Sequence, residues 1–336
     1  MAEKQYIRSL STKILIAFGT MSVGLTLFSL FATLITTDGE RSKYATLLLG
    51  VFQNLVVFGL AAVVTSKICY RKVLKPLKMN VAPSWKGIAM VVAVYVVSLP
   101  ALNWLVDWNA HITFPDSMQQ LYHTLKNLED LAMKETNFLL QGNDLLTTIL
   151  IVLEVGLLTG FGEEIFFRGA ILGAFEQKKG LNIHLSVWFV GILFSAFHFQ
   201  FFGFFPRCFL GIWLGYLFVW SRSLWLPVIA HALNNGMVVI VAYLTEQKVI
   251  GTDAIEKIGV PQAGEFPLLA FISAILTIAL IIATSKILIL FVVIKSVMTV
   301  PLTEMSGILP FSPRYLIYSC FALSSDIPAC LLPVSI

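Results

Sequence analysis

Six polar or ionisable residues stand inside stretches of the chain that otherwise consist of apolar side chains. They are Glu163, Glu164, Arg168, His198, His231 and Asn235. A charged or imidazole side chain is costly in hydrocarbon, so residues of this kind usually face an internal cavity and mark a functional site. Together the six supply a general base, a carboxylate–guanidinium pair, two imidazoles and an amide. This inventory suits hydrolysis of an amide bond by activated water.

The first pattern is Glu-Glu-x-x-x-Arg, over residues 163–168. Adjacent residues on a helix point about 100° apart, so Glu163 and Glu164 cannot serve one role equally. Glu164 and Arg168 are four residues apart and face each other, which predicts an ion pair. Glu163 is then the freer carboxylate and the candidate general base. The alternative interpretation is a charged cap where the helix leaves the membrane.

Two further patterns each contain a histidine one helical turn from a second candidate residue. His198 follows Phe194, which we expect to pack beside it, and His231 precedes Asn235. An asparagine can donate a hydrogen bond to a developing oxyanion or hold a water molecule. Taken singly, each histidine is more often a packing residue. The three patterns nevertheless lie at similar depths, roughly 12–21 Å from one membrane face at 1.5 Å per residue, and this favours one shared site.

The composition indicates an all-α integral membrane protein. The 336 residues are 57% hydrophobic and only 12% charged, about half the charged fraction of a soluble protein. Because a spanning helix needs about 20 apolar residues, we expect a polytopic bundle of about eight transmembrane helices. The net charge of +4 does not indicate a nucleic-acid partner. The expected spans are 13–36, 45–67, 87–106, 145–174, 184–202, 204–221, 223–245 and 266–294.

Helix-breaking residues and the distribution of charge add detail to this expected helical bundle. Gly203, Pro206 and Pro227 interrupt the fifth to seventh expected spans, so some of these can be short or re-entrant. Lysine and arginine concentrate at the N-terminus, in the loop 67–86 and in the turn 175–183. The positive-inside rule then predicts that both termini are cytoplasmic. We expect the protein in a bacterial inner (plasma) membrane.

We expect four parts along the chain. Residues 107–144 carry apolar residues at helical spacing after a helix start at Asp116. They predict an amphipathic helix on the outer surface, either a packing element or a lid over substrate. The four parts are 1–144 (three spans and this outer segment), 145–245 (a catalytic helical core), 246–296 (an outer loop and the last span) and 297–336 (a proline-containing tail without assigned structure).

The ordered set of three patterns over residues 163–235 resembles the CPBP intramembrane protease family. This family is also called the Abi, or CAAX protease and bacteriocin-processing, family, and it includes the type II CAAX prenyl endopeptidases. The resemblance covers roughly residues 145–245. It implies an intramembrane endopeptidase, embedded in the lipid bilayer, that hydrolyses a peptide bond of a membrane-associated peptide or protein.

The resemblance also implies a role for each motif. Glu163 would activate the attacking water, assisted by His198. His231 and Asn235 would stabilise the tetrahedral oxyanion. The remaining glutamate and the arginine of the first pattern would shape the site, with Phe194 in a supporting position.

The sequence leaves the metal dependence of the expected protease open. The family is often labelled a metalloprotease, and Glu163, His198 and His231 are candidate zinc ligands with one position left for water. However, the His-Glu-x-x-His arrangement of soluble zinc proteases is absent, and an asparagine is an unusual ligand. We favour a glutamate-activated water without metal.

Two other functions remain as alternatives. The first is a catalytically silent bacteriocin-immunity or scaffold protein of the same fold, which the intact motifs disfavour. The second is a proton-coupled transporter, which also uses intramembrane glutamate and histidine. The chain contains no detectable internal repeat of the kind that many transporters have, and this disfavours the second.

Overall fold

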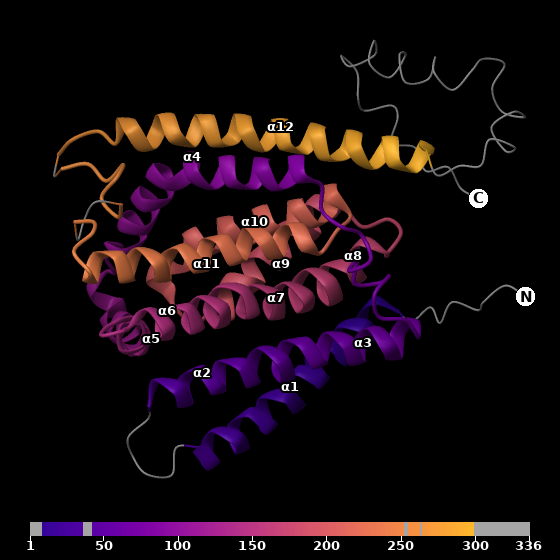
Figure 1. Ribbon diagram of the computed structural model, residues 1–336, viewed down its shortest axis with the longest axis horizontal. Helices are drawn as coiled ribbons and strands as arrows, with labels where there is room; N and C mark the ends of the chain where they lie inside the picture. Colours follow the sequence, from indigo (N-terminus) through magenta and orange to yellow (C-terminus); the bar gives the residue numbers. More distant parts are fainter. Residues whose placement is uncertain (1–8, 36–41, 252–254, 263, 299–336) are drawn as a thin grey trace, which may run out of the picture. The chain divides into compact units, whose positions relative to one another are not determined.

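The computed structural model describes residues 9–35, 42–251, 255–262 and 264–298 (Figure 1). The chain divides into two compact units, residues 1–288 and 289–336. The last helix, α12 (Leu268–Met298), runs from the first unit into the second. The predicted tail, 297–336, lies outside the described residues except for the last two residues of this helix. Apart from the end of α12, the residues described below belong to the first unit.

The described residues form a polytopic helical bundle, as the composition predicts. Seven of their helices are long and apolar enough to cross a membrane. Two of these are assembled from consecutive α and π segments. The seven are α1 (Leu10–Ile35); α2 (Lys43–Phe52) with η1 (Gln53–Leu60) and α3 (Ala61–Tyr70); α4 (Trp85–Ala110); α6 (Leu145–Ile151) with η3 (Val152–Leu158), α7 (Thr159–Glu164), η4 (Ile165–Leu172) and α8 (Gly173–Glu176); η5 (Phe201–Gly203) with α10 (Phe204–Ser221); α11 (Trp225–Glu246); and α12.

The fifth expected span is shorter than the apolar run suggests. It corresponds to α9 (Ile183–Ala196), which has 14 residues and ends before His198. Phe199 adopts φ 54°, a left-handed conformation that stops a helix. His198 therefore lies on the turn between α9 and η5 rather than in a helix. The other seven expected spans each coincide with a long helix, within a few residues at most ends.

The amphipathic helix expected in 107–144 is present as α5 (Gln119–Leu140), preceded by the 3₁₀ turn η2 (Asp116–Met118). One of its faces contacts η5, the turn that follows His198. The Tyr122 and Phe202 rings lie 5.8 Å apart, and Lys126 Nζ lies 5.7 Å from the centre of the Phe202 ring. Gln200 Nε2 donates to Glu129 Oε1 at 3.3 Å. Thus α5 packs on the segment that carries His198.

Polar caps set the start of the long helix 145–176, which carries the first pattern, and of α9, which leads to His198. Asp144 Oδ1 accepts from Thr147 N at 2.7 Å and begins the long helix 145–176. Hydrogen bonds from Thr147 lower the pKa of Asp144. Asn182 Oδ1 accepts from the backbone N–H of His184 at 2.9 Å and begins α9. Side chains that accept these bonds satisfy backbone donors that a helix start leaves free.

Glycines let the helices around the site approach closely. A Cβ on Gly191 of α9 would stand 2.8 Å from the backbone nitrogen of Ile212 in α10. A Cβ on Gly160 of α7 would stand 3.0 Å from the backbone nitrogen of Ala232 in α11. Contacts at these distances leave no room for a side chain. The glycines therefore fix how near α9 lies to α10, and α7 to α11.

Gly191→Ala is expected to destabilise the protein by about 1–3 kcal/mol, because the added methyl group meets the backbone of α10 and forces the two helices apart. Gly19→Ala is the matched control, since a Cβ on this exposed residue of α1 meets nothing within 4 Å. It should be neutral or slightly stabilising. Thermal unfolding in detergent measures both. Equal midpoints for the two variants would contradict the close approach of α9 and α10.

Candidate functional site

Three helical elements bring the predicted site residues together. The first pattern lies on the long helix 145–176, across α7 and η4. The histidine of the second pattern lies on the turn after α9, and the third pattern lies on α11. One direct hydrogen bond, from His231 to Glu164, joins the first pattern to the third. Phe194 of the second pattern contacts Arg168 of the first and His231 of the third. The expected convergence of the three patterns is therefore present in the structure.

Glu164 is the centre of this arrangement. Its Oε1 accepts from Arg168 Nη1 at 2.6 Å and from His231 Nδ1 at 2.8 Å. The side chains of Glu164 and Arg168 are fully buried, and that of His231 is 3% exposed. The ion pair expected from the spacing of Glu164 and Arg168 is thus present. The contact with His231, 67 residues further along the chain, was not foreseen.

Arg168 extends the same network to two more helices. Its Nη2 donates to the carbonyl oxygen of Gly211 in α10 at 2.8 Å. Its guanidinium carbon lies 4.6 Å from the centre of the Phe194 ring in α9, a cation–π distance. A guanidinium offers five N–H donors in a planar fork, so one arginine can hold a carboxylate and a carbonyl at once. Arg168 therefore ties the long helix to α9 and α10.

Phe194 stands between the two histidines. Its ring is 1% exposed and contacts His198 at 5.1 Å and His231 at 5.7 Å between ring centres, both edge-on. The expected packing of Phe194 beside His198 is present, and the same ring also orients His231. Contact with one buried ring restricts the rotation of both imidazoles.

A hydrogen bond of His198 determines which of its two ring nitrogens carries the proton. Its Nδ1 lies 2.9 Å from the carbonyl oxygen of Phe194. A carbonyl oxygen only accepts, so Nδ1 carries the proton and Nε2 is an acceptor when the ring is neutral. This bond also satisfies one of the carbonyls left free at the end of α9. Nε2 has no hydrogen bond to another described residue and can therefore accept a proton or a hydrogen bond.

Glu163 is the carboxylate that the network leaves unpaired. The residue is 9% exposed, and its Oε2 is buried with no hydrogen-bond partner. This oxygen lies 3.8 Å from His231 Nε2, too far for a direct bond but suited to a water held by both groups. Each glutamate has one buried oxygen, Oε2, without a hydrogen-bond partner, but only Glu164 is bound through its other oxygen to Arg168 and His231.

Asn235 is more engaged than the sequence suggests. Its Nδ2 donates to the carbonyl oxygen of Val155 in η3 at 3.2 Å, and its Oδ1 accepts from Asn234 Nδ2 at 3.1 Å. One N–H of its amide remains for another acceptor. Asn235 therefore locks α11 onto η3 as well as presenting a donor.

Sequence reasoning missed two groups of residues around the site. Glu154 and Asn54 form a buried hydrogen-bonded pair at 3.1 Å. Asn109, Ser195 and Arg207 hold the segment that carries His198. The signal for Glu154 was present, because it is a charged residue inside an expected span. The sequence gives only a weak indication of Asn109, Ser195 and Arg207, because their side chains bind the backbone of residues 200–205.

The segment 197–205 is pinned from three helices. Asn109 of α4 donates to the Phe201 carbonyl at 3.1 Å and accepts from the Phe205 N–H at 2.9 Å. Ser195 Oγ donates to the Phe204 carbonyl at 2.6 Å. Arg207 Nη2 donates to the Gln200 carbonyl at 2.5 Å. The turn bearing His198 is therefore held firmly although it is irregular.

The candidate zinc ligands from the sequence are Glu163, His198 and His231. Within the described residues, no three histidine, cysteine, aspartate or glutamate side chains are grouped as metal ligands. His231 uses Nδ1 for Glu164, and its Nε2 already stands near Glu163. Among the described residues the three candidate ligands are therefore not grouped as a metal site, and His231 is joined to Glu164 and lies near Glu163.

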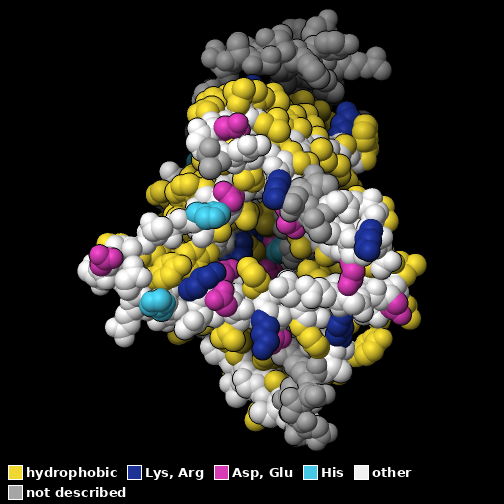
Figure 2. Space-filling view, turned by 90° about the vertical axis from the view of Figure 1, so that its left-hand side faces the viewer, with side chains coloured by type: hydrophobic (Ala, Val, Ile, Leu, Met, Phe, Trp, Pro, Cys, Tyr) yellow, Lys and Arg dark blue, Asp and Glu magenta, His cyan; other side chains and the backbone are white. Residues whose placement is uncertain are grey.

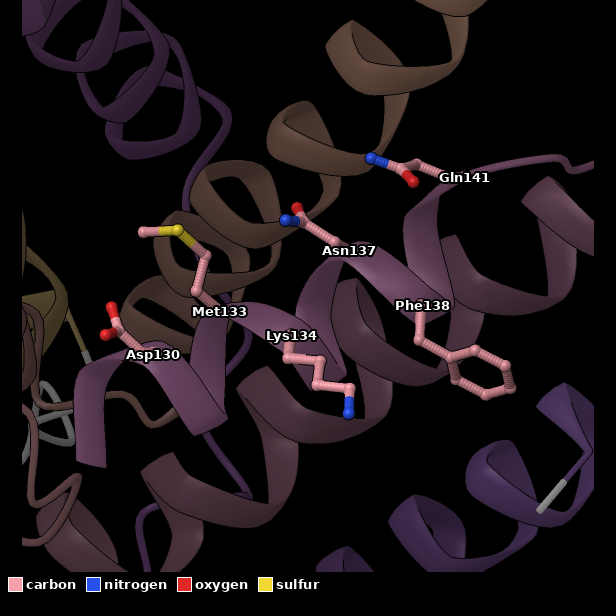
Figure 3. Close-up of a pocket in the computed structure, with 6 residues that line it drawn as sticks. All are labelled: Asp130, Met133, Lys134, Asn137, Phe138 and Gln141. Atoms are coloured by element: carbon pink, nitrogen blue, oxygen red, sulfur yellow. The ribbon is translucent and has the colours of Figure 1, made fainter. Parts of the chain in front are cut away.

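Figure 2 shows the end of the bundle where α5 lies. This face is hollowed near its centre, and acidic, basic and histidine side chains are visible at depth. A separate open pocket of about 440 Å³ lies along α5 (Figure 3), and none of the predicted site residues lines it. The pocket is lined by Asp130, Met133, Lys134, Asn137, Phe138 and Gln141.

One comparison with known proteins gives a match, over part of the chain. The family model of the type II CAAX prenyl endopeptidases of the Rce1-like kind matches residues 145–237. This interval contains all three patterns, so the match confirms the resemblance inferred from them. It supports a CAAX-type intramembrane protease, and with the seven apolar helices it makes the chain an integral membrane protein. No curated protein and no solved structure matches the chain.

Arg168→Ala is expected to destabilise the protein by about 3–5 kcal/mol, because it leaves the Glu164 carboxylate buried without its cation. Arg168→Lys keeps the charge but loses the planar fork that also reaches Gly211, so its loss should be intermediate. Denaturant unfolding in detergent measures both variants against Lys179→Ala, a change at an exposed lysine. Wild-type stability in Arg168→Ala would show that the buried network does not hold the helices together.

Proposed function

We propose that the protein is an intramembrane endopeptidase that hydrolyses a peptide bond of a membrane-associated peptide or protein. The observation that carries this proposal is the free Glu163 carboxylate beside His231 Nε2, next to a neighbour, Glu164, whose charge is already satisfied. A free buried carboxylate next to imidazoles is suited to take a proton from water. The Rce1-like family match over this segment supports the same chemistry.

In the proposed reaction, a water molecule binds between Glu163 and the imidazoles. Glu163 takes one proton as the water oxygen attacks the carbonyl carbon of the scissile bond. His198, with its proton on Nδ1, accepts a hydrogen bond from the water at Nε2 and orients it. The carbonyl π bond opens to give a tetrahedral oxyanion, and Glu163 carries the proton towards the nitrogen that leaves.

The oxyanion requires donors, because its charge develops only in the transition state. Asn235 has one N–H not used by Val155. His231 donates through Nε2 when its ring carries both protons, with Nδ1 bound to Glu164. As the C–N bond breaks, the proton held by Glu163 passes to the amine. Glu164, Arg168 and Phe194 act by positioning these groups rather than by touching substrate.

Glu163→Gln is expected to lower kcat by about 10²- to 10⁴-fold, because an amide cannot accept the proton of the water. The unfolding midpoint should be unchanged, since Oε2 has no partner to lose. The assay uses protein in liposomes with a prenylated CAAX peptide and an unmodified amphipathic peptide. Glu265→Gln, a change in an exposed loop, is the control. Equal cleavage by wild type and Glu163→Gln would remove the proposal and favour a silent immunity or scaffold protein.

We also propose that both termini are cytoplasmic, in a bacterial inner membrane, since the turn 175–183 is basic. An epitope inserted after Lys179 should then be reached by antibody only in permeabilised spheroplasts. An epitope inserted after Gln247, at the end of α11, should be reached in intact ones. If instead antibody reaches the two epitopes in the opposite way, the topology is inverted, and the assignment of the site residues is unaffected.

A further inference from the structure

Glu154 and Asn54 form a second buried polar cluster beside the site. Asn54 Nδ2 lies 3.1 Å from Glu154 Oε1 and 2.8 Å from Thr159 Oγ1, and Thr159 Oγ1 donates to the Glu154 carbonyl at 3.1 Å. Glu154 is 8% exposed and Asn54 is 3% exposed. The three patterns of the sequence and the proposed reaction make no use of this cluster.

The fold leaves room for this cluster. A Cβ on Gly50 of α2 would stand 2.2 Å from Glu154 Oε1, so the carboxylate occupies the space where a side chain would be. A Cβ on Gly162 would stand 3.1 Å from Asn54 Oδ1 and 2.9 Å from the Asn54 carbonyl. Asn54 therefore lies between Glu154 and the backbone that immediately precedes Glu163. The cluster and the free carboxylate of the site are neighbours through this one asparagine.

Helix geometry and the third pattern support the same location. Asn54 lies in η1 and Glu154 in η3, and both segments are π-helical. Single π turns occur frequently at functional sites, because the wider turn redirects side chains. The residue after Glu154, Val155, accepts a hydrogen bond from Asn235 at its carbonyl. The Glu154 side chain is thus bound by Asn54, while the backbone of the next residue, Val155, is bound by α11.

The two buried glutamates on this helix differ in how their charge is satisfied. Glu164 accepts from a guanidinium and an imidazole. The Glu154 side chain has only neutral partners, the Asn54 amide and the Thr159 hydroxyl, and among the described residues no lysine, arginine or histidine forms an ion pair with it. Asn54 Oδ1 is likewise buried with no hydrogen-bond partner. A buried charge without a cation is costly, and such residues in spans bind substrates or ions.

We propose that Glu154, held by Asn54, is a substrate-positioning subsite that pairs with a basic side chain, lysine or arginine, of the bound peptide. An ammonium carries three donors and a guanidinium five, which suits the Glu154 carboxylate and the orphaned Asn54 oxygen together. The pairing would fix the peptide along the long helix, with its scissile carbonyl next to Glu163. This inference rests on the proposed peptidase function and adds a charge preference to it.

Binding to the inactive Glu163→Gln protein tests the subsite without requiring cleavage. The probes are fluorescent amphipathic peptides identical except for lysine, norleucine or glutamate at one position, which is scanned along the peptide. At one position, the lysine peptide should bind at least tenfold more tightly than the norleucine peptide. Glu154→Gln added to this protein should abolish the difference by weakening the lysine peptide alone. Glu154→Asp should restore part of it.

Several results would overturn the subsite. One is that lysine and norleucine peptides bind alike at every position. Another is that Glu154→Gln weakens all peptides equally, which would make the cluster purely structural. Asn54→Ala should lower the lysine preference as well, and an unchanged preference would remove the positioning role of Asn54. Unfolding midpoints of each variant, with Glu265→Gln as the control, separate these effects from misfolding.

The cleavage assay distinguishes this inference from the proposed function. In protein with Glu163 intact, Glu154→Gln should lower kcat/KM for the lysine peptide through KM while leaving the norleucine peptide unchanged. If no peptide is cleaved by the wild-type protein but the lysine preference in binding is present, the peptidase proposal fails and the subsite stands. If cleavage depends on Glu163 but shows no charge preference, the subsite alone fails.

Discussion

The interaction on which the structure depends is the hydrogen bonding of one buried oxygen, Glu164 Oε1, to both Arg168 and His231. Burial of a carboxylate and a guanidinium is favourable only when the remaining donors and acceptors are also satisfied. Arg168 meets this condition in part, because it reaches the Gly211 carbonyl and the Phe194 ring, while its Nε and Glu164 Oε2 are buried without a hydrogen-bond partner. A single charged pair therefore joins the long helix to α9, α10 and α11. The glycine contacts between these helices follow from it, since the arginine spans them only if they lie close together.

The ion pair of Glu164 also explains why the Glu163 carboxylate lies apart from Arg168. Consecutive residues on a helix diverge by about 100°, so the fixed direction of Glu164 turns Glu163 away from Arg168. Glu163 then faces His231 Nε2 at 3.8 Å and keeps an unpartnered oxygen. His231 contacts both glutamates through its two nitrogens, and its orientation is set by Glu164 and Phe194. The geometry of the candidate base is thus a consequence of the ion pair beside it.

The sequence predicts those parts of this arrangement that helix geometry alone determines. The pairing of Glu164 with Arg168 and of Phe194 with His198 follows from a separation of four residues, and both contacts are present. The contact of His231 with Glu164 depends on how two helices pack, which no local pattern encodes. The same holds for Asn54 and Glu154, whose direction depends on π turns that the apolar pattern of 145–174 does not reveal. A charged residue in a span is nevertheless a signal by itself, and it would have found Glu154.

The early end of α9 has a consequence for access to the site. A helix continuing to residue 202, as the apolar run suggested, would enclose His198 among apolar turns. Instead the chain turns at Phe199, and hydrogen bonds from Asn109, Ser195 and Arg207 hold the turn in place. His198 Nε2 is therefore presented from an irregular segment, on which α5 packs. Figure 2 shows charged and histidine side chains at the bottom of a hollow in the face where α5 lies. Irregular backbone at this depth is tolerated where it is buried in protein or borders a cavity, and a hydrolytic site among membrane helices needs access for water.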